Sequence, residues 1–408
     1  MKRTKNYNIK VAFYSGVIPA STFIENSIKG ISESGIVVYL FGQKTKAYLS
    51  TNNNIKVFAT PTNKISKLIF LMKNFTILLI KNPFLLIKAV SFYFKIAMKK
   101  GYSFIEWGSK FLPIMINPPD IIHIQWAKSL SDLFFLKKLL GVKFILSLRG
   151  AHINYSPIAE PDLANEYRKL FPLLDGFHAV SSSISREAQR YGAIKDKIKV
   201  VHSSINQNKL NSFQKKSLEF KNKIRIISVG RHHWKKGYRY ALLAMKRLIE
   251  QEFEIEYLIL AKDRPDEEIV YQIDQLSLSS IVRLISVKCQ EEIYKMMVES
   301  DCLLLPSLEE GISNTVLEAM YIGLPVISSD CGGMKEIIED GYNGILFSNW
   351  NIDAMVKALT VFIKSPLEKK VKLATKAKKT VTENHSIINH GNELKVLYEN
   401  VLQKGFIQ

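Results

Sequence analysis

The chain has 408 residues, of which 47% are apolar and 23% charged, and its formal net charge is +20. This length suits two α/β domains better than one, and the apolar content is enough for two cores, which excludes a long disordered chain. The three cysteines form no Cys-x-x-Cys pair and are odd in number, so reduced thiols in the cytosol fit best. No apolar core with a small-residue cleavage site follows the basic first residues, so we expect no secretory signal.

The positive charge is concentrated in one half of the chain. Residues 1–205 carry 29 of the 57 basic residues but only 11 of the 37 acidic ones, and the rest of the chain is nearly neutral. We therefore expect an anionic partner for the first half. The charge is mostly lysine, interleaved with aliphatic residues rather than stacking aromatic ones, so nucleic acid is not the expected partner.

The chain opens with the pattern of an α/β sheet. We predict a strand at Ile9–Ser15, a helix at Glu25–Ser34 and a second strand at Ile36–Phe41. Gly16 follows the first strand directly, where a glycine lets a ligand approach the backbone closely. The alternative is an ordinary turn glycine.

The next stretch contains no acidic residue. Between Ser34 and Ile105 there are eleven lysines, and Lys64–Lys100 is rich in Leu, Ile and Phe, although lysines interrupt it before it reaches the length of a spanning helix. Pro83 divides this stretch into two predicted helices. Four lysines recur at multiples of seven and would form a stripe: Lys67, Lys81, Lys88 and Lys95. Such a basic amphipathic pair suits an anionic membrane surface. The alternative is that the apolar faces pack on the sheet and the lysines are only solvated.

The first half then completes its sheet. A helix is predicted at Leu130–Leu140, and a polar linker at Ser203–Asn222. The predicted strands are Asp120–Gln125, Val142–Leu148, Gly176–Ser181 and Lys197–His202.

The second half opens with a strand, a basic turn and a helix, at Ile224–Val229, Gly230–Gly237 and Tyr238–Glu250. Arg231 and Lys236 in the turn would place a guanidinium and an ammonium at the strand's carboxyl end, where they can bind an anionic group. The two adjacent histidines in the turn lack metal-ligand spacing, and no Asp-x-Asp pair is present, so we expect no metal site. There is also no Gly-x-Gly-x-x-Gly and no Gly-Lys-Ser/Thr loop, which excludes dinucleotide oxidoreductases and P-loop ATPases.

Further strands and helices continue this pattern. The predicted strands are Glu256–Ala261, Val282–Val287, Cys302–Leu305 and Val326–Ser328, and the predicted helices are Glu267–Leu276 and Gln290–Ser300. After Cys302–Leu305, Pro306 ends the strand, the chain turns at Glu309–Gly311, and Ser313 or Asn314 begins a helix. A strand, a sharp turn and a helix N-terminus with free N–H groups form an anion site. Glu310 lies on that turn, and Glu318 about one turn inside the helix.

This spacing, with Pro306-Ser307 before it and Gly323-Leu324-Pro325-Val326 after it, closely resembles glycosyltransferase family 4. The turn after the first strand of the second half resembles the family's Gly-Arg-x-x-x-x-Lys-Gly motif, whose Arg and Lys hold the donor diphosphate. The resemblance implies the α/β GT-B fold, with two Rossmann-like domains facing each other across a cleft, and transfer with retention at the anomeric carbon.

The resemblance also implies roles for individual residues. Glu310 would contact the donor sugar and Glu318 the ribose hydroxyls, since a carboxylate accepts two hydrogen bonds at once. The catalytic residues would be Glu310, Arg231 and Lys236. The full expected donor site is Gly16, Arg231, Lys236, Glu310, Gly311, Ile312, Ser313, Asn314 and Glu318.

The chain departs from the family pattern at two places. Where family members often have His-Gly-x-Asp, Arg149 stands at the usual histidine and His152 at the usual aspartate. Each is a candidate for contact with the donor phosphate or the acceptor, and a structural hydrogen bond is the alternative. Family members often have a glycine after two strands of the second half, but this chain has Lys262 and Ser286 at those positions. No contacts to the nucleotide base are therefore assigned there.

Together these features predict three segments: an acceptor-binding domain at 1–205 with membrane-facing helices at about 64–100, a nucleotide-sugar domain at 206–384, and a terminal helix at 385–408 that crosses back to the first domain. The expected function is a metal-independent glycosyltransferase of cell-surface polysaccharide biosynthesis, with a nucleotide-diphosphate sugar as co-substrate, no cofactor and a lipid-linked saccharide acceptor. Membrane contact would involve Lys81, Lys88 and Lys95, on the cytoplasmic, inner face. The alternatives are a nucleotide-sugar epimerase of the same fold and a non-catalytic membrane-associated partner subunit.

Overall fold

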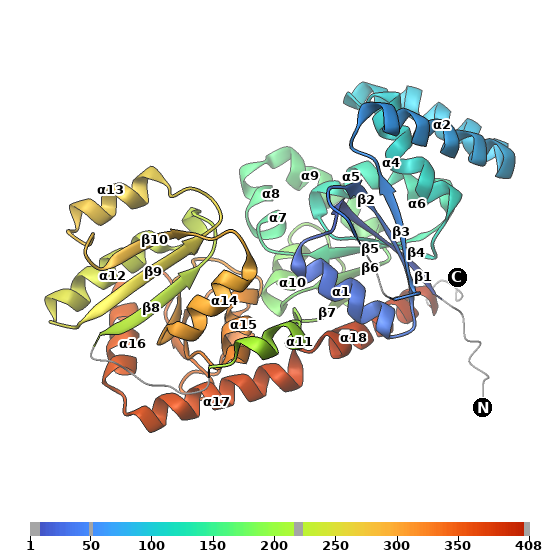
Figure 1. Ribbon diagram of the computed structural model, residues 1–408. Coiled ribbons are helices and arrows are strands. Elements are labelled where there is room, and N and C mark those ends of the chain that lie inside the picture. The colour runs from blue at the N-terminus through green and yellow to red at the C-terminus, as the bar shows by residue number, and fades with distance from the viewer. Residues whose placement is uncertain (1–8, 49–51, 216–222, 404–408) are drawn as a thin grey trace, which may run out of the picture. The chain divides into compact units, whose positions relative to one another are not determined.

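The computed structural model describes residues 9–48, 52–215 and 223–403, which form two compact domains (Figure 1). The first domain contains the described residues up to Val180, then Ser185–Val201, and finally the residues from Ile387 onward. The second contains Ser181–Ile184 and His202–Ser386. The described chain therefore leaves the first domain and returns to it for its last helix.

The described part of the first domain contains a seven-stranded parallel sheet in the order β3-β2-β1-β4-β5-β6-β7. Its strands are β1 (Lys10–Ile18), β2 (Val37–Lys44), β3 (Ile55–Thr60), β4 (Ile121–Ile124), β5 (Lys143–Leu148), β6 (Gly176–Ala179) and β7 (Ile198–Val200). The strand order reverses between β1 and β4. In open α/β sheets, ligands bind outside the carboxyl ends of the strands at such a reversal.

The first domain also contains helices. They are α1 (Thr22–Glu33), α2 (Lys64–Lys81), α3 (Pro83–Phe92), α4 (Phe104–Ile116), α5 (Leu130–Leu133), α6 (Phe135–Leu140), α7 (Ala151–Asn154), α8 (Ser156–Ala159), α9 (Pro161–Leu170), α10 (Ser182–Gln189) and α18 (Ile387–Gln403). A π-helical turn η1 (Tyr93–Ala97) and a 3-10 turn η2 (Met98–Lys100) extend α3. The predicted break at Pro83 is confirmed, because the Asn82 side chain accepts a hydrogen bond from the Leu85 N–H at 2.9 Å and caps α3.

The last helix, α18, packs against α1 in the first domain (Figure 1). Two glycines meet where these helices cross: a Cβ on Gly30 would lie 2.3 Å from the Ile387 carbonyl oxygen, and one on Gly391 only 2.1 Å from the Gly30 carbonyl oxygen. Apolar side chains of α18, including Leu394 and Tyr398, join the core beside β1. The crossing is therefore close enough to admit no side chain at either glycine.

The described part of the second domain contains a six-stranded parallel sheet in the order β10-β9-β8-β11-β12-β13. Its strands are β8 (Ile224–Val229), β9 (Ile255–Ala261), β10 (Val282–Ser286), β11 (Cys302–Leu305), β12 (Val326–Ser329) and β13 (Ile345–Phe347). Its helices are α11 (Gln207–Leu210), α12 (Tyr238–Glu250), α13 (Glu267–Gln275), α14 (Gln290–Glu299), α15 (Asn314–Ile322), α16 (Ile352–Lys364) and α17 (Leu367–Asn384). The strand order reverses between β8 and β11.

Both faces of this sheet are covered. Successive strand residues join different apolar clusters: Ile226 packs with α12 and α16, whereas Ile227 packs with α14, α15 and α17. This alternation follows from the strand's two-residue period. It explains why the strands of the second domain appear in the sequence as short continuous apolar runs.

The structure differs from several predicted boundaries. The first strand does not end at Ser15 but continues to Ile18, because a register shift between Tyr14 and Gly16 lets β1 go on pairing with β2. The predicted helix Leu130–Leu140 divides at Phe134 into α5 and α6. The edge strands β3 and β13 and the helix α4 were not predicted. The predicted linker at 203–222 contains α11 in its described part, and residues 216–222 lie outside the described residues.

Candidate functional site

The candidate site of the second domain is built on two loops that follow neighbouring strands. β8 and β11 are paired, with Ile226 opposite Cys302, so the residues after Val229 and after Leu305 emerge side by side at the carboxyl edge of the sheet. This is also the position where the strand order reverses. The topology alone therefore brings the basic turn and the glutamate turn together.

Glycines allow the basic turn to fold back on itself. Gly230 has φ +159°, and a Cβ there would lie 2.8 Å from Cε of Lys236, so the lysine stem passes directly over this backbone. Gly237 has φ +67°, and its Cβ would lie 1.9 Å from the carbonyl oxygen of Pro306. A side chain at Gly237 would collide with the backbone of the loop that carries Glu310, and one at Gly230 would displace the Lys236 side chain.

Lys236 and Glu310 form a shielded ion pair. The Lys236 Nζ lies 2.6 Å from Glu310 Oε1, and the two side chains are only 23% and 17% exposed. The Ser307 hydroxyl donates a second hydrogen bond to Oε1 at 3.0 Å. Burial raises the pKa of Glu310, but Lys236, Ser307 and the charge of Lys235 together lower it more, so the pKa lies below its usual value and the carboxyl is ionised. Both bonds are accepted by Oε1, and neither engages the second oxygen.

The helix that follows Glu310 presents its N-terminus at the same loop. Ser313 is the N-cap of α15, and its side chain makes no capping hydrogen bond. Gly311, Ile312 and Ser313 are buried. The Oδ1 atom of Asn314 is buried without a hydrogen-bond partner. Uncapped N–H groups and the positive end of the helix dipole favour an anion here.

Glu318 is held elsewhere on α15. Its Oε1 accepts hydrogen bonds from Gln290 Nε2 and from the Tyr294 hydroxyl, both at 2.9 Å and both on α14. Burial raises the pKa of Glu318 to about 7, although these hydrogen bonds oppose the shift. The two glutamates of the motif thus have opposite electrostatic settings, one ionised by a lysine and one close to half-protonated at neutral pH.

The remaining residues of the basic turn are less constrained. Arg231 is exposed. The His232 N–H donates to Asp263 at 3.0 Å, and the ring of His233 accepts from the Lys235 N–H at 3.2 Å. Across the described ranges, no group of three His, Cys, Asp or Glu residues is placed to hold a metal ion.

In the first domain, Gly16 lies within β1 with φ +81° and open space where a Cβ would be. It lines a pocket of about 140 Å³ that also contains Gln43, Glu106 and Lys110. Burial lowers the pKa of Lys110, and Asp132, 3.5 Å away, opposes this shift. This polar pocket, which sequence reasoning missed, is formed partly by α4.

Arg149 and His152 have different surroundings. Arg149 donates to Gln125 Oε1 at 3.4 Å, and its guanidinium lies over the Phe23 ring at 4.6 Å. Burial lowers its pKa to about 10, and its Nε has no hydrogen-bond partner. His152 lies beside Trp126, with a ring separation of 5.3 Å and a buried Nδ1 that also lacks a partner. Each residue therefore has one buried polar atom without a hydrogen-bond partner.

Behind Arg149 lies a buried polar network that the sequence did not reveal. His123 contacts the Tyr398 hydroxyl at 2.7 Å and the Ser147 hydroxyl at 3.0 Å. Ser147 also contacts His178 at 3.1 Å. Burial lowers the pKa of both histidines well below the usual value, so they are neutral. The network joins α18 to β4, β5 and β6 and has a structural role.

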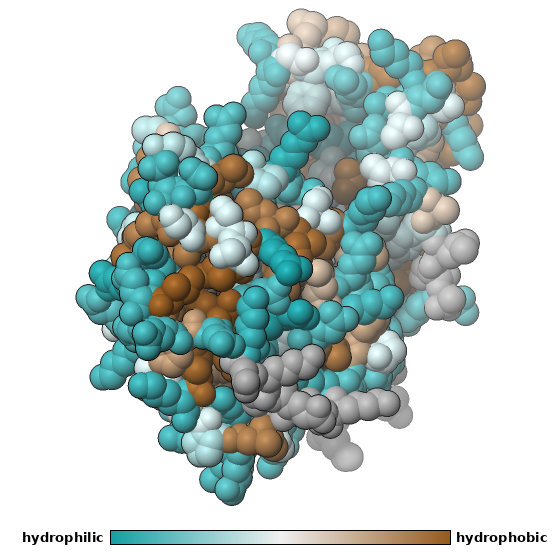
Figure 2. Space-filling view, turned by 60° about the vertical axis from the view of Figure 1, so that its left-hand side comes forward, coloured by the Kyte–Doolittle hydropathy of each residue, from teal (hydrophilic) through white to brown (hydrophobic). Residues whose placement is uncertain are grey.

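The helices from α2 to η2 expose both lysines and apolar side chains, and we call this surface the exposed helical face. Lys81, Lys88 and Lys95 are all exposed. Its exposed apolar residues are Ile65, Leu68, Ile69, Met72, Leu79, Ile80, Phe84, Ile87, Phe94, Ile96 and Met98. Figure 2 shows apolar and hydrophilic side chains mixed at the top of the view, over α2 and α3. The alternative that these apolar side chains pack on the sheet is wrong for this set.

No helix in the described part of the chain combines the length and the low polarity that a membrane-crossing helix needs.

Comparison with known proteins connects the second-domain site to a family. Residues 211–380 match the family described as glycosyl transferases group 1. The matched segment includes both loops of the candidate site, from Gly230 to Glu318.

Two curated relatives agree with this group 1 match. The chain is 31% identical over 249 residues to the amylovoran biosynthesis glycosyltransferase AmsK of Erwinia amylovora, a match that covers 59% of this chain and 60% of the relative. It is 27% identical over 232 residues to the putative colanic acid biosynthesis glycosyltransferase WcaL of Escherichia coli K12, covering 55% and 57%. The chain thus spans about 60% of the length of these relatives.

A solved structure resembles the whole chain. The structure of HepE of Anabaena in complex with UDP and glucose covers 96% of this chain and 100% of its own, with a TM-score of 0.67 and 15% identity. At this identity the likeness shows the fold alone. The predicted α/β GT-B fold with two Rossmann-like domains is confirmed.

The site also contains residues that sequence analysis missed. A Cβ on Gly332 would lie 1.7 Å from the Glu310 carbonyl oxygen, and the Gly333 N–H donates to the Gly311 carbonyl at 3.1 Å. The turn after β12 thus supports the backbone of the glutamate turn. The consecutive glycines were the available signal. Lys235, which is only 9% exposed, had no such signal, because a buried lysine looks like a surface one in sequence.

Proposed function

We propose that this chain is a retaining glycosyltransferase that moves a sugar from a nucleotide-diphosphate sugar to a lipid-linked saccharide in cell-surface polysaccharide biosynthesis. The observation that carries the proposal is the ion pair of Lys236 and Glu310 at the strand-order reversal of the second domain. The group 1 match and the polysaccharide relatives support the reaction class and the pathway. Retention comes from the family 4 resemblance of the glutamate motif.

The positive groups of the site suit a departing diphosphate. As the bond to the anomeric carbon breaks, negative charge grows on the leaving phosphate, and only contacts that strengthen at that moment accelerate transfer. Lys236, Arg231 and the N-terminus of α15 supply this charge from one edge of the sheet. We therefore expect no divalent ion to be required.

Glu310 and Glu318 would divide the recognition of the donor. The Glu310 carboxylate keeps one oxygen clear of Lys236 and Ser307, and that oxygen can accept a hydrogen bond from a sugar hydroxyl. Glu318 lies farther along α15 and would accept from the ribose hydroxyls. Gly16, Arg149 and His152 are the proposed contributions of the first domain to donor phosphate or acceptor binding.

The exposed helical face supports a location at a membrane. Its lysines would attract anionic headgroups, and its apolar side chains would enter the boundary between headgroups and acyl chains. We therefore propose a peripheral protein on the cytoplasmic face of the cell membrane, where a lipid-linked acceptor would be available. HepE, the structural neighbour with UDP and glucose, makes a UDP-sugar the first donor to test.

The proposal is tested by screening nucleotide sugars for thermal stabilisation of the purified chain. A true donor at one hundred times its dissociation constant should add about 2.7 kcal/mol to the free energy of unfolding. The Lys236→Ala variant should lose most of this gain. The Lys246→Ala variant, which removes a half-exposed lysine of the same domain, should keep it.

Two outcomes would contradict the proposal. If no nucleotide sugar stabilises the chain, a nucleotide sugar is not its donor. Conversion of the donor to its epimer, followed by NMR without any acceptor, would make the chain an epimerase instead.

A further inference from the structure

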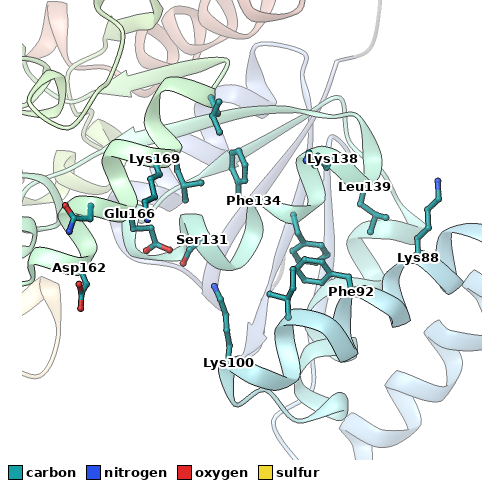
Figure 3. Close-up of a pocket in the computed structure, with 15 residues that line it drawn as sticks. Lys88, Phe92, Lys100, Ser131, Phe134, Lys138, Leu139, Asp162, Glu166 and Lys169 are labelled. Carbon is teal, nitrogen blue, oxygen red and sulfur yellow. The ribbon is translucent and has the colours of Figure 1, made fainter.

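The first domain contains a long open groove that no part of the proposed donor site uses. It has a volume of about 1030 Å³, at the upper end of the range of about 300–1,000 Å³ for small-molecule pockets. One wall is formed by α3, η1 and η2, the other by α9, and the floor by α5 and α6 (Figure 3). Phe92, Ile96, Phe134 and Leu139 make its lining largely apolar.

The wall formed by α3, η1 and η2 is held against the floor at two points. The Phe92 ring stacks on the Phe135 ring with 4.1 Å between centroids, which fixes α3 against α6. Farther along, the Tyr102 hydroxyl donates to Asp132 and joins the end of η2 to α5. The groove is therefore a formed feature of the first domain rather than a gap between loose helices.

The connections of the sheet give the groove a direction. α5 and α6 run from the carboxyl end of β4 to the amino end of β5, and α9 ends just before β6. Lys100 precedes α4, which runs back to the amino end of β4. Lys100 and Ser131 therefore lie at the carboxyl edge of the sheet, and Lys138 and Leu139 lie at the opposite end. Figure 3 shows the Lys100 side chain extending toward Ser131 and Glu166.

The groove carries an excess of positive charge. Among the residues that the structure describes, none forms an ion pair with its four lysines, which are Lys88, Lys100, Lys138 and Lys169. Only Asp162 and Glu166 oppose them. An apolar floor beside unpaired lysines fits a molecule that has both a hydrocarbon chain and an anionic group.

We propose that the groove holds the hydrocarbon chain of the lipid-linked acceptor, with its phosphate at Lys100 and Ser131. The inference rests on the proposed function and adds where the lipid carrier lies. Ile96 belongs both to the groove and to the exposed helical face, so a chain can pass from the membrane into the groove. The groove ends at the carboxyl edge of the sheet, where ligands bind in α/β folds. A groove that only attached the protein to bulk lipid would not need to lead to this edge.

The test is calorimetry on the full chain with farnesyl phosphate, a short prenyl phosphate. Farnesyl phosphate should bind, and inorganic phosphate or farnesol alone should bind much more weakly, because each offers half of the recognition. Leu173→Glu and Lys100→Gln should each weaken binding about tenfold, since one places a charge against the chain and the other removes a phosphate contact.

Matched variants outside the groove control for folding and net charge. Leu173 is 54% exposed and Ile194 is 41% exposed, so Ile194→Glu makes the same change at a similar surface position. Lys195→Gln matches Lys100→Gln, since both lysines are exposed. Neither control should alter the binding of farnesyl phosphate.

Three results would overturn the inference. They are undetectable binding of farnesyl phosphate, equal binding by the groove variants and the wild type, and full competition by dihexanoyl phosphatidylglycerol, which would make the groove a site for bulk lipid. Thermal stabilisation by nucleotide sugar is measured on the same preparations. A chain that is stabilised by donor but does not bind farnesyl phosphate would refute only the groove, whereas the reverse result would refute only the proposed donor chemistry.

Discussion

The two domains use positive charge in opposite ways. In the second domain, Lys236 is shielded and paired with one carboxylate at 2.6 Å, beside Gly230 and Gly237. In the first, Lys81, Lys88 and Lys95 are exposed beside apolar side chains that are also exposed. A fixed ion pair can recognise one ligand geometry. Unpaired surface charges attract any anionic surface, and this attraction weakens as the salt concentration rises. The same residue type therefore predicts specificity in one domain and general adhesion in the other.

The largest effect is expected when the ion pair of Lys236 and Glu310 loses its carboxylate. Glu310→Ala should slow transfer about a thousandfold, the upper range for loss of one preorganised polar contact at a reacting centre. Glu318→Ala should mainly raise KM, because a ribose contact is made equally before and during the reaction. Steady-state kinetics with the donor found by the thermal screen measure both.

The control for these variants is Glu250→Ala, which removes an exposed glutamate of α12. It should leave kcat and KM unchanged. Full activity in Glu310→Ala combined with loss in Glu318→Ala would reverse the two assignments.

A smaller effect is expected at the cations. Lys236→Ala or Arg231→Ala should each cost roughly 2–4 kcal/mol of transition-state stabilisation, the range for one lost charge-assisted contact to a leaving group. In Lys236→Ala the pKa of Glu310 should also rise, because burial then acts without its main opposing charge. Single-turnover rates measure the first effect, and their pH profile the second. Inactivation by a chelator with rescue by magnesium would show that a metal shares this role.

The raised pKa of Glu318 predicts a pH dependence. Its value of about 7 lies above the usual 4.5. Between these two pH values the folded chain without donor therefore keeps a proton on Glu318, whereas the unfolded chain does not. If donor binding needs the ionised form, affinity should fall by about tenfold per unit as the pH drops below 7. Glu318→Gln should flatten this dependence, which calorimetry at several pH values would detect. An unchanged slope in Glu318→Gln would assign the dependence to another group.

The same shift predicts a change in stability. Because the native chain binds the extra proton, this group's contribution to stability should decline as the pH rises from about 4.5 to about 7. Thermal denaturation of Glu318→Gln should lack that decline.

The smallest effect per residue is expected at the exposed helical face. Each lysine near an anionic bilayer contributes about 1 kcal/mol. Changing Lys81, Lys88 and Lys95 together to Gln should therefore weaken sedimentation with anionic vesicles and leave donor affinity intact. High salt should reverse only part of the wild-type binding, since the apolar side chains are not screened.

A matched triple variant sharpens this test. Lys369, Lys372 and Lys379 are exposed on α17 in the second domain, and their change to Gln removes the same charge elsewhere. Vesicle binding should survive this change. Equal binding by both triple variants would mean that the lysines of the exposed helical face are only solvated.

The sequence predicted the second domain well because its signals are local. The strand Ile224–Val229 and the helix Tyr238–Glu250 have the predicted bounds. A short apolar run indicates a buried strand, and an amphipathic segment that follows a glycine indicates a helix. The turn glutamate and the turn lysine were also chosen as candidates from neighbouring residues. Their pairing followed only from the strand order, which places β8 beside β11 although about seventy residues lie between them.

Other features depend on distant partners that leave little trace in sequence. β3 is a half-exposed edge strand, so its apolar alternation is weak. The His123 network requires side chains from β4, β5, β6 and α18 to meet. The support that Gly332 gives to Glu310 depends on a backbone contact, and no side-chain pattern records it.

The crossing of Gly30 with Gly391 has a consequence for how the protein is made. A ribosome delivers the chain from its N-terminus, at about 5–20 residues per second. The second domain is contiguous apart from a few residues, and it can close as soon as its last strand and helices have emerged. The first domain lacks α18 until the second domain has been synthesised, and the surface of α1 that receives this helix stays uncovered meanwhile. The half that is made first is therefore the half that finishes folding last, and a shortened gene that ends after β7 would encode a domain with an open core.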